Sequence, residues 1–381
     1  MSWYDGLSFF LFLGAALVPA VILGILQKPI RLYGLALSAL TIGLIFSSDA
    51  RQIVYLVIYL VWSVGLIYIY DHERSAKGRK PAVFYAAVLL ALIPLVLCKI
   101  SPLISVNVFG FTGISYLTFR VLQILIETYD GVICRPRLLP TLGFLVFFPS
   151  FSSGPIDRSR RFTRDWDSIL PRDEYLDQAA EGFFFLLLGA AGKFIVSALA
   201  YRMMGYLDVP EAQLLQRIGY AYAYSLYLYS DFAGYSAMAV GTGLILGVRL
   251  PQNFHFPFLA KDIKDFWDRW HISLSHWFRD FVFTRFVIFS TRKKLFHDRM
   301  GRAVAGFMVN MCLMGAWHGL SLHFLLYGVY HGLLLSLTEV YQKKSRFFKN
   351  NKGKTWYRIL SWFVTMQLVV FGLYLFSGKL L

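Results

Sequence analysis

Long uncharged stretches dominate the pattern of hydrophobic and polar positions along the chain. Residues 303–338 contain no Asp, Glu, Lys or Arg and are long enough for two membrane passes with a turn between them. Six further stretches share this property, namely residues 7–26, 32–48, 52–70, 82–98, 100–119 and 359–378. A helix needs about 20 mostly apolar residues to cross the hydrocarbon core of a membrane. The pattern therefore predicts an all-α, polytopic membrane protein.

Three segments in the middle of the chain are less regular. Residues 138–156 are apolar but interrupted by prolines, and irregular backbone at membrane depth needs cover from protein or a water-filled cavity. We therefore expect a re-entrant or half-membrane element that lines a cavity. Residues 157–181 mix both charge signs, which predicts a solvated loop with short helices. Residues 222–248 are rich in Tyr and Gly, with Asp231 as their only formal charge.

The segment 261–285 has an apolar stripe at helical spacing. Its apolar members recur at intervals of three and four residues: Ile263, Phe266, Trp267, Trp270, Leu274, Trp277, Phe278 and Phe281. Many charged residues occupy the other side, which excludes a membrane-spanning helix. The pattern predicts one amphipathic helix that lies at the membrane interface, with His271 at the flank of the stripe.

Composition and charge exclude several other classes of protein. Only 16% of the 381 residues are charged and 57% are hydrophobic, whereas about 25% charged residues is usual in soluble domains. This excludes a soluble enzyme, a secreted disulfide scaffold and a disordered chain. The net charge of +16 resides in short loops rather than in one basic patch, so we expect no nucleic-acid partner. Basic loops favour the cytoplasm, so Lys28, Arg31 and the loop 72–80 place the N-terminus outside.

His318 is the strongest candidate for chemistry. It lies within the uncharged stretch 303–338, and an ionisable group inside a membrane segment is by default a functional candidate. Low polarity keeps an imidazole neutral and able to accept a proton, so His318 could activate a hydroxyl group to attack an acyl donor. His271, beside Trp267 and Trp270, is the second candidate. A structural role for either histidine, satisfied by a backbone carbonyl or exposed at the surface, is the alternative.

Other chemistries find less support in the residues. The histidine pairs are five residues apart and do not share a helix face, so we expect no metal site. There is neither a P-loop nor a G-x-S-x-G motif, which argues against an ATPase or a serine hydrolase. Asp231 is a further buried-charge candidate, and a structural ion pair or helix cap explains it equally well.

Several motifs together resemble the membrane-bound O-acyltransferase superfamily. They are DFWDRWHISLSHWFRD at 265–280, WHG at 317–319, YSDFAGY at 229–235, and FP at 148–149 followed by GPI at 154–156. Within the superfamily, LPQNF at 250–254 and PFLAKDIK at 257–264 are similar to the branch that transfers D-alanyl groups to teichoic acids. Phe281–Ile288 lacks the Pro and Gly that are typical of the polysaccharide O-acetyltransferases.

The resemblance implies a fold and a site. The fold would be a single domain over residues 1–381 with its catalytic core at about 113–340, a ring of about 10–12 transmembrane helices plus re-entrant and interfacial helices enclosing a tunnel. His318 would assist removal of a proton from the acceptor hydroxyl, and His271 would be the accessory catalytic histidine. Asp231, Trp317 and Trp267 would line the substrate tunnel.

The resemblance also implies partners on both sides of the membrane. The donor would be D-alanine, held as a thioester on the phosphopantetheine arm of a small acidic carrier protein in the cytoplasm, so no cofactor would be bound covalently. The carrier would dock on residues 281–288, which include Arg285 and Val287. Teichoic or lipoteichoic acid would be the acceptor, with other membrane proteins of the D-alanylation system as partners in a Gram-positive cell membrane.

Three other functions stay open at this point. The first is an O-acetyltransferase that acts on an exported polysaccharide. The second is a transporter or flippase without covalent chemistry, in which His318→Ala would leave translocation largely intact. The third is a structural membrane scaffold, in which neither histidine would matter.

Overall fold

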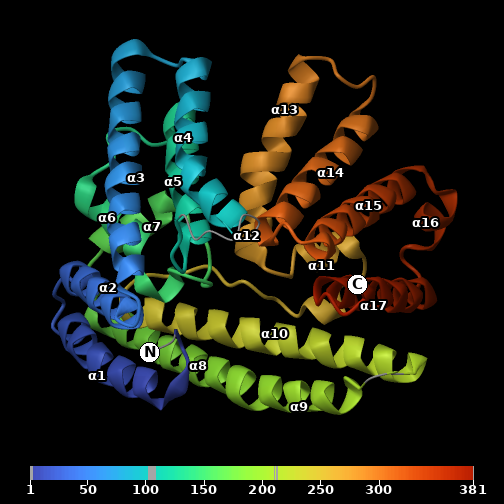
Figure 1. Cartoon of the computed structure of the whole chain (residues 1–381), viewed down its shortest axis with the longest axis horizontal. Coiled ribbons are helices and arrows are strands. Elements are labelled where there is room, and N and C mark those ends of the chain that lie inside the picture. The colour runs from blue at the N-terminus through green and yellow to red at the C-terminus, as the bar shows by residue number, and fades with distance from the viewer. Residues whose placement is uncertain (1–2, 102–108, 210, 212, 381) are drawn as a thin grey trace. The chain divides into compact units, whose positions relative to one another are not determined.

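The chain is all-α in the part that the structure describes. The computed structural model describes residues 3–101, 109–209, 211 and 213–380, so part of the apolar run 100–119 lies outside the described residues. Helices follow one another from α1 (Gly6–Ile25) to α17 (Thr355–Phe376), as Figure 1 shows. The chain divides into two compact units, one formed by residues 1–190 and 234–251, the other by residues 191–233 and 252–381. The predicted all-α class is confirmed.

The first unit contains the N-terminal helices. They are α1, α2 (Arg31–Phe46), α3 (Ala50–Lys77), α4 (Pro81–Ile100), α5 (Ile114–Asp130), α6 (Leu138–Val146), the 3-10 helix η2 (Phe148–Ser150), α7 (Ser159–Asp167), most of α8 (Arg172–Ala191) and the end of α10 (Leu214–Ile245).

The second unit contains the remaining elements. They are the π-helix η3 (Gly192–Ser197), α9 (Ala198–Leu207), most of α10, the 3-10 helix η4 (Pro257–Leu259), α11 (Ile263–Trp267), α12 (Ile272–Phe278), the π-helix η5 (Arg279–Phe283), α13 (Thr284–Arg292), α14 (Arg299–His318), α15 (Leu322–Lys344), α16 (Arg346–Asn351) and α17.

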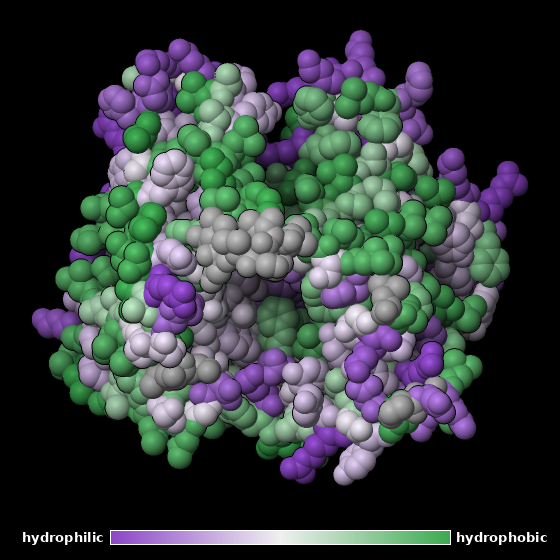
Figure 2. Space-filling view, viewed as in Figure 1, coloured by the Kyte–Doolittle hydropathy of each residue, from purple (hydrophilic) through white to green (hydrophobic). Residues whose placement is uncertain are grey.

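Five helices of the described chain are long and apolar enough to cross a membrane. They are α1, α3, α4, α17 and the continuous helical stretch Arg172–Leu207, which runs through α8, η3 and α9. Many of their large apolar side chains are exposed, such as Leu7 at 76% and Leu187 at 74%, and Figure 2 shows apolar residues over much of the visible face. Exposed apolar surface of this extent fits a lipid environment. The protein is a multi-pass membrane protein, whereas the predicted ring of about 10–12 spans and its tunnel stay predictions.

The predicted break in the segment 138–156 is confirmed, and a buried arginine explains how its backbone is satisfied. Arg120 on α5 is 1% exposed and donates to the carbonyl oxygens of Phe144 at 2.6 Å and Leu145 at 2.8 Å. It also donates to the carbonyl and hydroxyl oxygens of Ser150. Four hydrogen bonds from one guanidinium thus replace the helical bonds that the interrupted backbone lacks. Re-entry of this segment into the membrane stays a prediction.

The charged segment 157–181 contains the predicted short helix, α7, but is less solvated than its charges indicated. The short helix α7 buries Phe162 and Trp166, and Asp157 is 1% exposed. Arg161 pairs with Asp157 four residues earlier. The charges lie on one side of α7 while the aromatic residues pack inward, so the helix is amphipathic.

The predicted single helix over 261–285 is wrong in one respect, because the structure breaks it. The helix α11 ends at Trp267, and α12 begins at Ile272 after a turn in which His271 has a left-handed backbone with φ 44°. The π-helix η5 then leads into α13. The break turns His271 away from the flank of the apolar stripe into the protein, where it is 4% exposed.

The helices α14 and α15 form a close antiparallel pair in the second unit. A Cβ atom on Gly315 would lie 2.5 Å from the carbonyl oxygen of Phe324 and 3.0 Å from the Cα atom of Gly328. Farther along the pair, Ser336 donates to the carbonyl oxygen of Val304. Only glycine permits this approach of the two backbones. The pair fixes the C-terminal end of α14, where His318 is the last residue.

Candidate functional site

A cavity of about 60 Å³ in the second unit contains both candidate histidines. Its walls come from α10, α11, the turn before α12, α12, α14, α15 and α17. The lining residues are mostly aromatic or aliphatic: Leu228, Phe232, Trp267, Trp270, His271, Leu274, Met314, His318, Tyr327, Leu373 and Phe376. The structure therefore brings together His271, His318 and Trp267, which are three of the residues predicted from the sequence.

Asn253 holds the turn that presents His271 to the cavity. Its backbone carbonyl accepts a hydrogen bond from the Ile272 amide at 2.8 Å. Its side-chain oxygen accepts from the Ser273 amide at 3.2 Å and from the Ser273 hydroxyl at 2.5 Å. The same oxygen lies 3.4 Å from Nδ1 of His271. Because an amide oxygen only accepts, Nδ1 of His271 carries the proton and Nε2 keeps its lone pair.

Burial keeps His271 neutral. The His271 turn lies outside the five candidate spans, and burial lowers the pKa of His271 to about 3, with His318 as a second, smaller cause. Phe232 packs edge-on against the imidazole, with ring centroids 4.7 Å apart. A neutral imidazole with a fixed tautomer can accept a hydrogen bond or a proton.

His318 is half-buried at the end of α14 and surrounded by aromatic rings. The ring centroids of Phe376 and Tyr327 lie 5.0 Å and 6.2 Å from that of His318. Both neighbours are nearly perpendicular to the imidazole. His318 lies close enough to His271 to influence its charge. The two histidines thus share one mostly apolar space, which is the arrangement expected for proton transfer in a low-polarity site.

Asp231 and Trp317 do not belong to the residues that line this cavity. Asp231 forms an ion pair with Lys193 of η3, with Nζ and Oδ1 2.5 Å apart, which is the structural alternative weighed from the sequence. Its neighbour Phe232 lines the cavity instead. Trp317 packs against His318 with ring centroids 4.6 Å apart, outside the lining.

Arg285 and Val287 lie on α13, apart from the cavity. Both are half-buried, and Val287 faces α14, since its side chain lies 3.4 Å from the position of a Cβ atom on Gly306. The neighbouring side chains of Ile288 and Phe289 are 46% and 50% exposed. The surface of α13 therefore combines apolar side chains with basic residues toward its end.

Sequence reasoning missed several contributors to this site. Asn253 and Phe232 lie within the motifs 250–254 and 229–235 but received no role of their own, and Tyr327 and Phe376 looked like ordinary apolar residues of long helices. Their roles depend on contacts between helices far apart in the sequence. No periodicity within one helix could reveal them.

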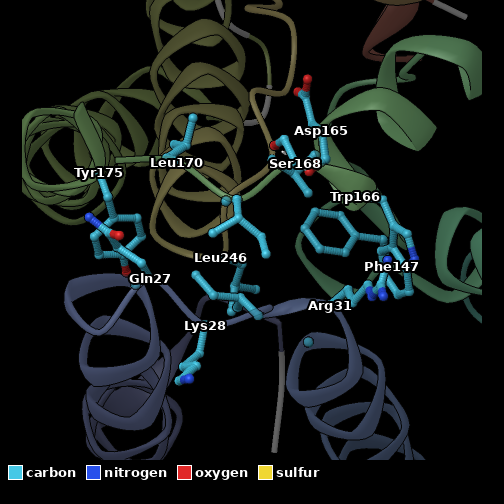
Figure 3. A pocket seen from close by; sticks show the side chains of 16 residues that line it. Gln27, Lys28, Arg31, Phe147, Asp165, Trp166, Ser168, Leu170, Tyr175 and Leu246 are labelled. Atoms are coloured by element: carbon cyan, nitrogen blue, oxygen red, sulfur yellow. Dashed lines mark hydrogen bonds between the residues drawn. The ribbon is translucent and has the colours of Figure 1, made fainter. Parts of the chain in front are cut away.

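The first unit contains a smaller hollow that includes none of the residues predicted for the reaction. It measures about 30 Å³, enough for roughly one water molecule. Figure 3 shows Trp166 and Tyr175 on opposite sides of it with Leu246 between them. Within the described part of the chain, no three His, Cys, Asp or Glu side chains are grouped to hold a metal ion.

Comparisons with known proteins show the family to which the chain belongs. The family model described as membrane-bound O-acyltransferase matches residues 46–377. The teichoic acid D-alanyltransferase of Bacillus subtilis is 39% identical over 390 residues, covering 100% of this chain and 98% of the relative. Its counterpart in Streptococcus thermophilus is 36% identical, covering 99% and 95%. The probable alginate O-acetylase of Pseudomonas aeruginosa is 30% identical over 285 residues, covering 73% of this chain and 51% of the relative.

These matches confirm the resemblance that the sequence motifs indicated. The family model covers most of the chain, including the whole second unit up to residue 377. The two teichoic acid D-alanyltransferases match over nearly their whole length and share the same class of reaction in their names. The protein therefore belongs to the membrane-bound O-acyltransferase family and is a membrane-bound O-acyltransferase.

Proposed function

We propose that the protein transfers a D-alanyl group from a carrier thioester toward hydroxyl groups of teichoic or lipoteichoic acid, directly or through a membrane partner. The cavity that contains His271 and His318 is the observation that carries this proposal. The cavity is lined mostly by aromatic and aliphatic side chains, which suits a short acyl group beside the two histidines. Similarity over the full length to teichoic acid D-alanyltransferases favours alanyl among the short acyl groups.

The lining favours direct transfer without an acyl-enzyme. None of the residues that line the cavity is Ser, Thr or Cys, so the lining offers no thiol, and its only hydroxyl is the phenol of Tyr327. His318 accepts the proton of the acceptor hydroxyl while its oxygen attacks the thioester carbonyl carbon. The new C–O ester bond forms, the C–S bond breaks, and the sulfur leaves as a thiolate that takes the proton back from His318. A thioester is already activated, so orientation and a base suffice.

His271 serves as a positioning residue in this proposal. Its Nδ1 proton is directed at Asn253, so Nε2 is the nitrogen left to face the donor. Its neutrality avoids placing a positive charge beside the carbonyl group before reaction. We therefore assign it to orienting the donor while His318 moves the proton.

The carrier docks on α13 in this proposal. An acidic carrier that presents its phosphopantetheine arm needs a basic surface with apolar contacts. The exposed side chains of Ile288 and Phe289 beside Arg285, followed by Arg292 and Lys293, supply both. The phosphopantetheine arm is part of the donor substrate and is not a resident cofactor.

The sidedness of the reaction can be tested with one cysteine. Cys134 is exposed in the loop after α5. This loop is tied to the basic loop after α3, because the Arg135 amide donates to Asp71 and Arg79 pairs with Asp130. We expect Cys134 to be cytoplasmic, and therefore protected from a membrane-impermeant maleimide in intact cells and labelled in inverted vesicles. Labelling in intact cells would show that the protein has the opposite orientation. A Cys134→Ser variant controls for labelling of the other thiols.

Asn253→Ala is expected to lower kcat by about 10²-fold, because His271 loses the acceptor that fixes its tautomer. Asn253→Asp keeps an acceptor at the same place and should recover most of the rate. Its negative charge favours the imidazolium and raises the pKa of His271 from about 3. The Asp variant should therefore lose activity at a higher pH than the wild type as the pH falls, in pH–rate profiles of purified protein. Equal loss in both variants would contradict the tautomer role.

The proposed function is tested in a strain that lacks its own D-alanyltransferase. Expression of the protein should restore D-alanine esters on teichoic acids, measured as D-alanine released by mild base, and only when the carrier protein is present. Wild-type expression with membrane-localised protein but no D-alanine ester would overturn the proposal.

O-acetylation of an exported polysaccharide is the second candidate. It is favoured by the same cavity, which also accommodates an acetyl group, and by the 30% identity to the alginate relative. Mild base treatment of material from the same cells distinguishes the two functions, because release of acetate without D-alanine would establish acetyl transfer.

A further inference from the structure

The cavity walls contain many aromatic rings and no carboxylate. Phe232, Trp267, Trp270, Tyr327 and Phe376 line it, and none of the lining residues is Asp or Glu. Two carboxylates are adjacent in sequence to lining residues. Asp231 is paired with Lys193, and Asp268 is exposed. A positively charged substrate group in this cavity therefore meets aromatic rings rather than an acidic side chain.

The D-alanyl group carries such a charge. An α-amino group titrates near pH 8, so it is mostly protonated at neutral pH. An unpaired ammonium in a desolvated cavity is unfavourable unless the walls compensate for its lost water. The faces of Trp and Tyr rings attract a cation within about 6 Å of the ring centre, and the attraction strengthens when water is excluded.

We propose that Trp267 and Tyr327 recognise the α-ammonium of the D-alanyl group through cation–π contacts, and so select an aminoacyl donor over a neutral acyl donor. This inference rests on the proposed function and deepens it, because it names the chemical feature of the donor that the site recognises. The ring of Tyr327 lies 6.2 Å from that of His318. The ammonium is one carbon atom away from the reacting carbonyl, so a group that binds it must lie this close to the base.

A buried histidine holds these two rings in place. His331 on α15 is 0% exposed, and its ring centroid lies 5.2 Å from that of Trp267 and 4.6 Å from that of Tyr327. The Trp267 and His331 rings are perpendicular at 89°. Neither ring nitrogen of His331 has a hydrogen-bond partner among the described residues. A Cβ atom on Gly372 would lie 2.5 Å from Nε2 of His331, so α17 closes against this imidazole.

The arrangement shows how an imidazole without a hydrogen-bond partner among the described residues is packed at this position. Three aromatic rings, those of Trp267, Tyr327 and Tyr330, lie within 5.2 Å of the His331 ring. The planar ring of His331 fits edge-on between them and supports them from outside the cavity lining, since His331 itself does not line the cavity.

The test compares donors that differ only in the amine. Purified protein in nanodiscs is given carrier protein loaded with D-alanyl or with D-lactyl thioester, in which a hydroxyl replaces the amine. The ratio of the two kcat/KM values measures recognition of the ammonium. We expect the wild type to prefer D-alanyl by about 30-fold, equivalent to about 2 kcal/mol at 1.4 kcal/mol per tenfold. The preference should decline as the pH rises through about 8, where the amine loses its charge.

Substitutions identify the rings responsible. Trp267→Leu and Tyr327→Leu should each reduce the preference several-fold toward unity, whereas Trp267→Phe and Tyr327→Phe keep a ring face and should retain most of it. Trp356→Leu, at a tryptophan that is 48% exposed and outside the cavity, is the matched control and should leave the ratio unchanged. Because both donors are measured on the same preparation, partial misfolding lowers both rates and leaves their ratio intact.

The outcomes separate this inference from the proposed function. A wild type that transfers D-alanyl, with a ratio that Trp267→Leu and Tyr327→Leu both leave unchanged, overturns the inference alone. A wild type that transfers D-alanyl and D-lactyl equally well also overturns it. A wild type that transfers acetyl but no D-alanyl overturns the proposed function, and the inference with it.

Discussion

His318→Ala is expected to reduce D-alanyl transfer by about 10³-fold, because a positioned general base contributes roughly 10²–10⁴-fold to such a step. The variant removes the imidazole at the end of α14 and leaves the backbone pairing of α14 with α15 unaffected. The measurement is the D-alanine ester content of teichoic acids in cells, together with the amount of protein in the membrane fraction. Ester at background with normal protein would support His318 as the base.

His297→Ala is the control for this prediction. His297 is exposed in the loop before α14 and does not line the cavity, so its removal should leave the ester content unchanged. Normal ester content in the His318→Ala variant would exclude a base role for this residue. It would also favour the transporter alternative, in which no covalent step depends on His318.

Arg120→Leu is expected to have the largest effect on stability, a loss of about 3–5 kcal/mol. The carbonyl oxygens of Phe144, Leu145 and Ser150 would lose their donor in a buried segment with few helical bonds of its own. Each buried polar group without a partner costs about 1–3 kcal/mol. We expect Tm in detergent to fall by about 10 °C, read from the unfolding of purified protein.

Two further variants distinguish this role from a general effect of charge. Arg120→Lys keeps the charge but cannot reach four acceptors at once, so its Tm should lie between those of the wild type and the Leu variant. Arg51→Leu removes an arginine whose side chain is 78% exposed and should leave Tm nearly unchanged. A Tm for Arg120→Leu equal to that of the wild type would mean that the broken segment does not depend on this guanidinium.

Local patterns were sufficient to predict the membrane class and the family. The uncharged runs at residues 7–26, 52–70, 82–98 and 359–378 became α1, α3, α4 and α17, four of the five candidate spans. Burial in lipid requires continuous apolar sequence, so the signal lies within each segment. The motifs around His271 and His318 indicated the family that the full-length relatives then showed.

The errors arose where distant contacts override a local pattern. The stripe in 261–285 fits one helix, yet Asn253 binds the backbone at Ile272 and Ser273 and stabilises a left-handed turn at His271. The charges of 157–181 indicated a solvated loop with short helices, but Phe162 of the short helix α7 packs against Phe144 and Phe147. In both cases the deciding contact comes from residues outside the segment, and hydrophobic periodicity within the segment does not encode it.

The sequence alone predicted an all-α, multi-pass membrane protein with His318 as a candidate base, and its motifs resembled the acyltransferase family, because hydrophobic length and local motifs are properties of contiguous residues. Only the tertiary structure showed that His271 is buried and held by Asn253, that Asp231 pairs with Lys193, and that aromatic rings from several helices enclose one small cavity. These features depend on side chains that are far apart in the chain and meet only after the helices have packed. Their geometry is set by the close approach of α14 and α15 and by the breaks between α11 and α13, which no single helix specifies.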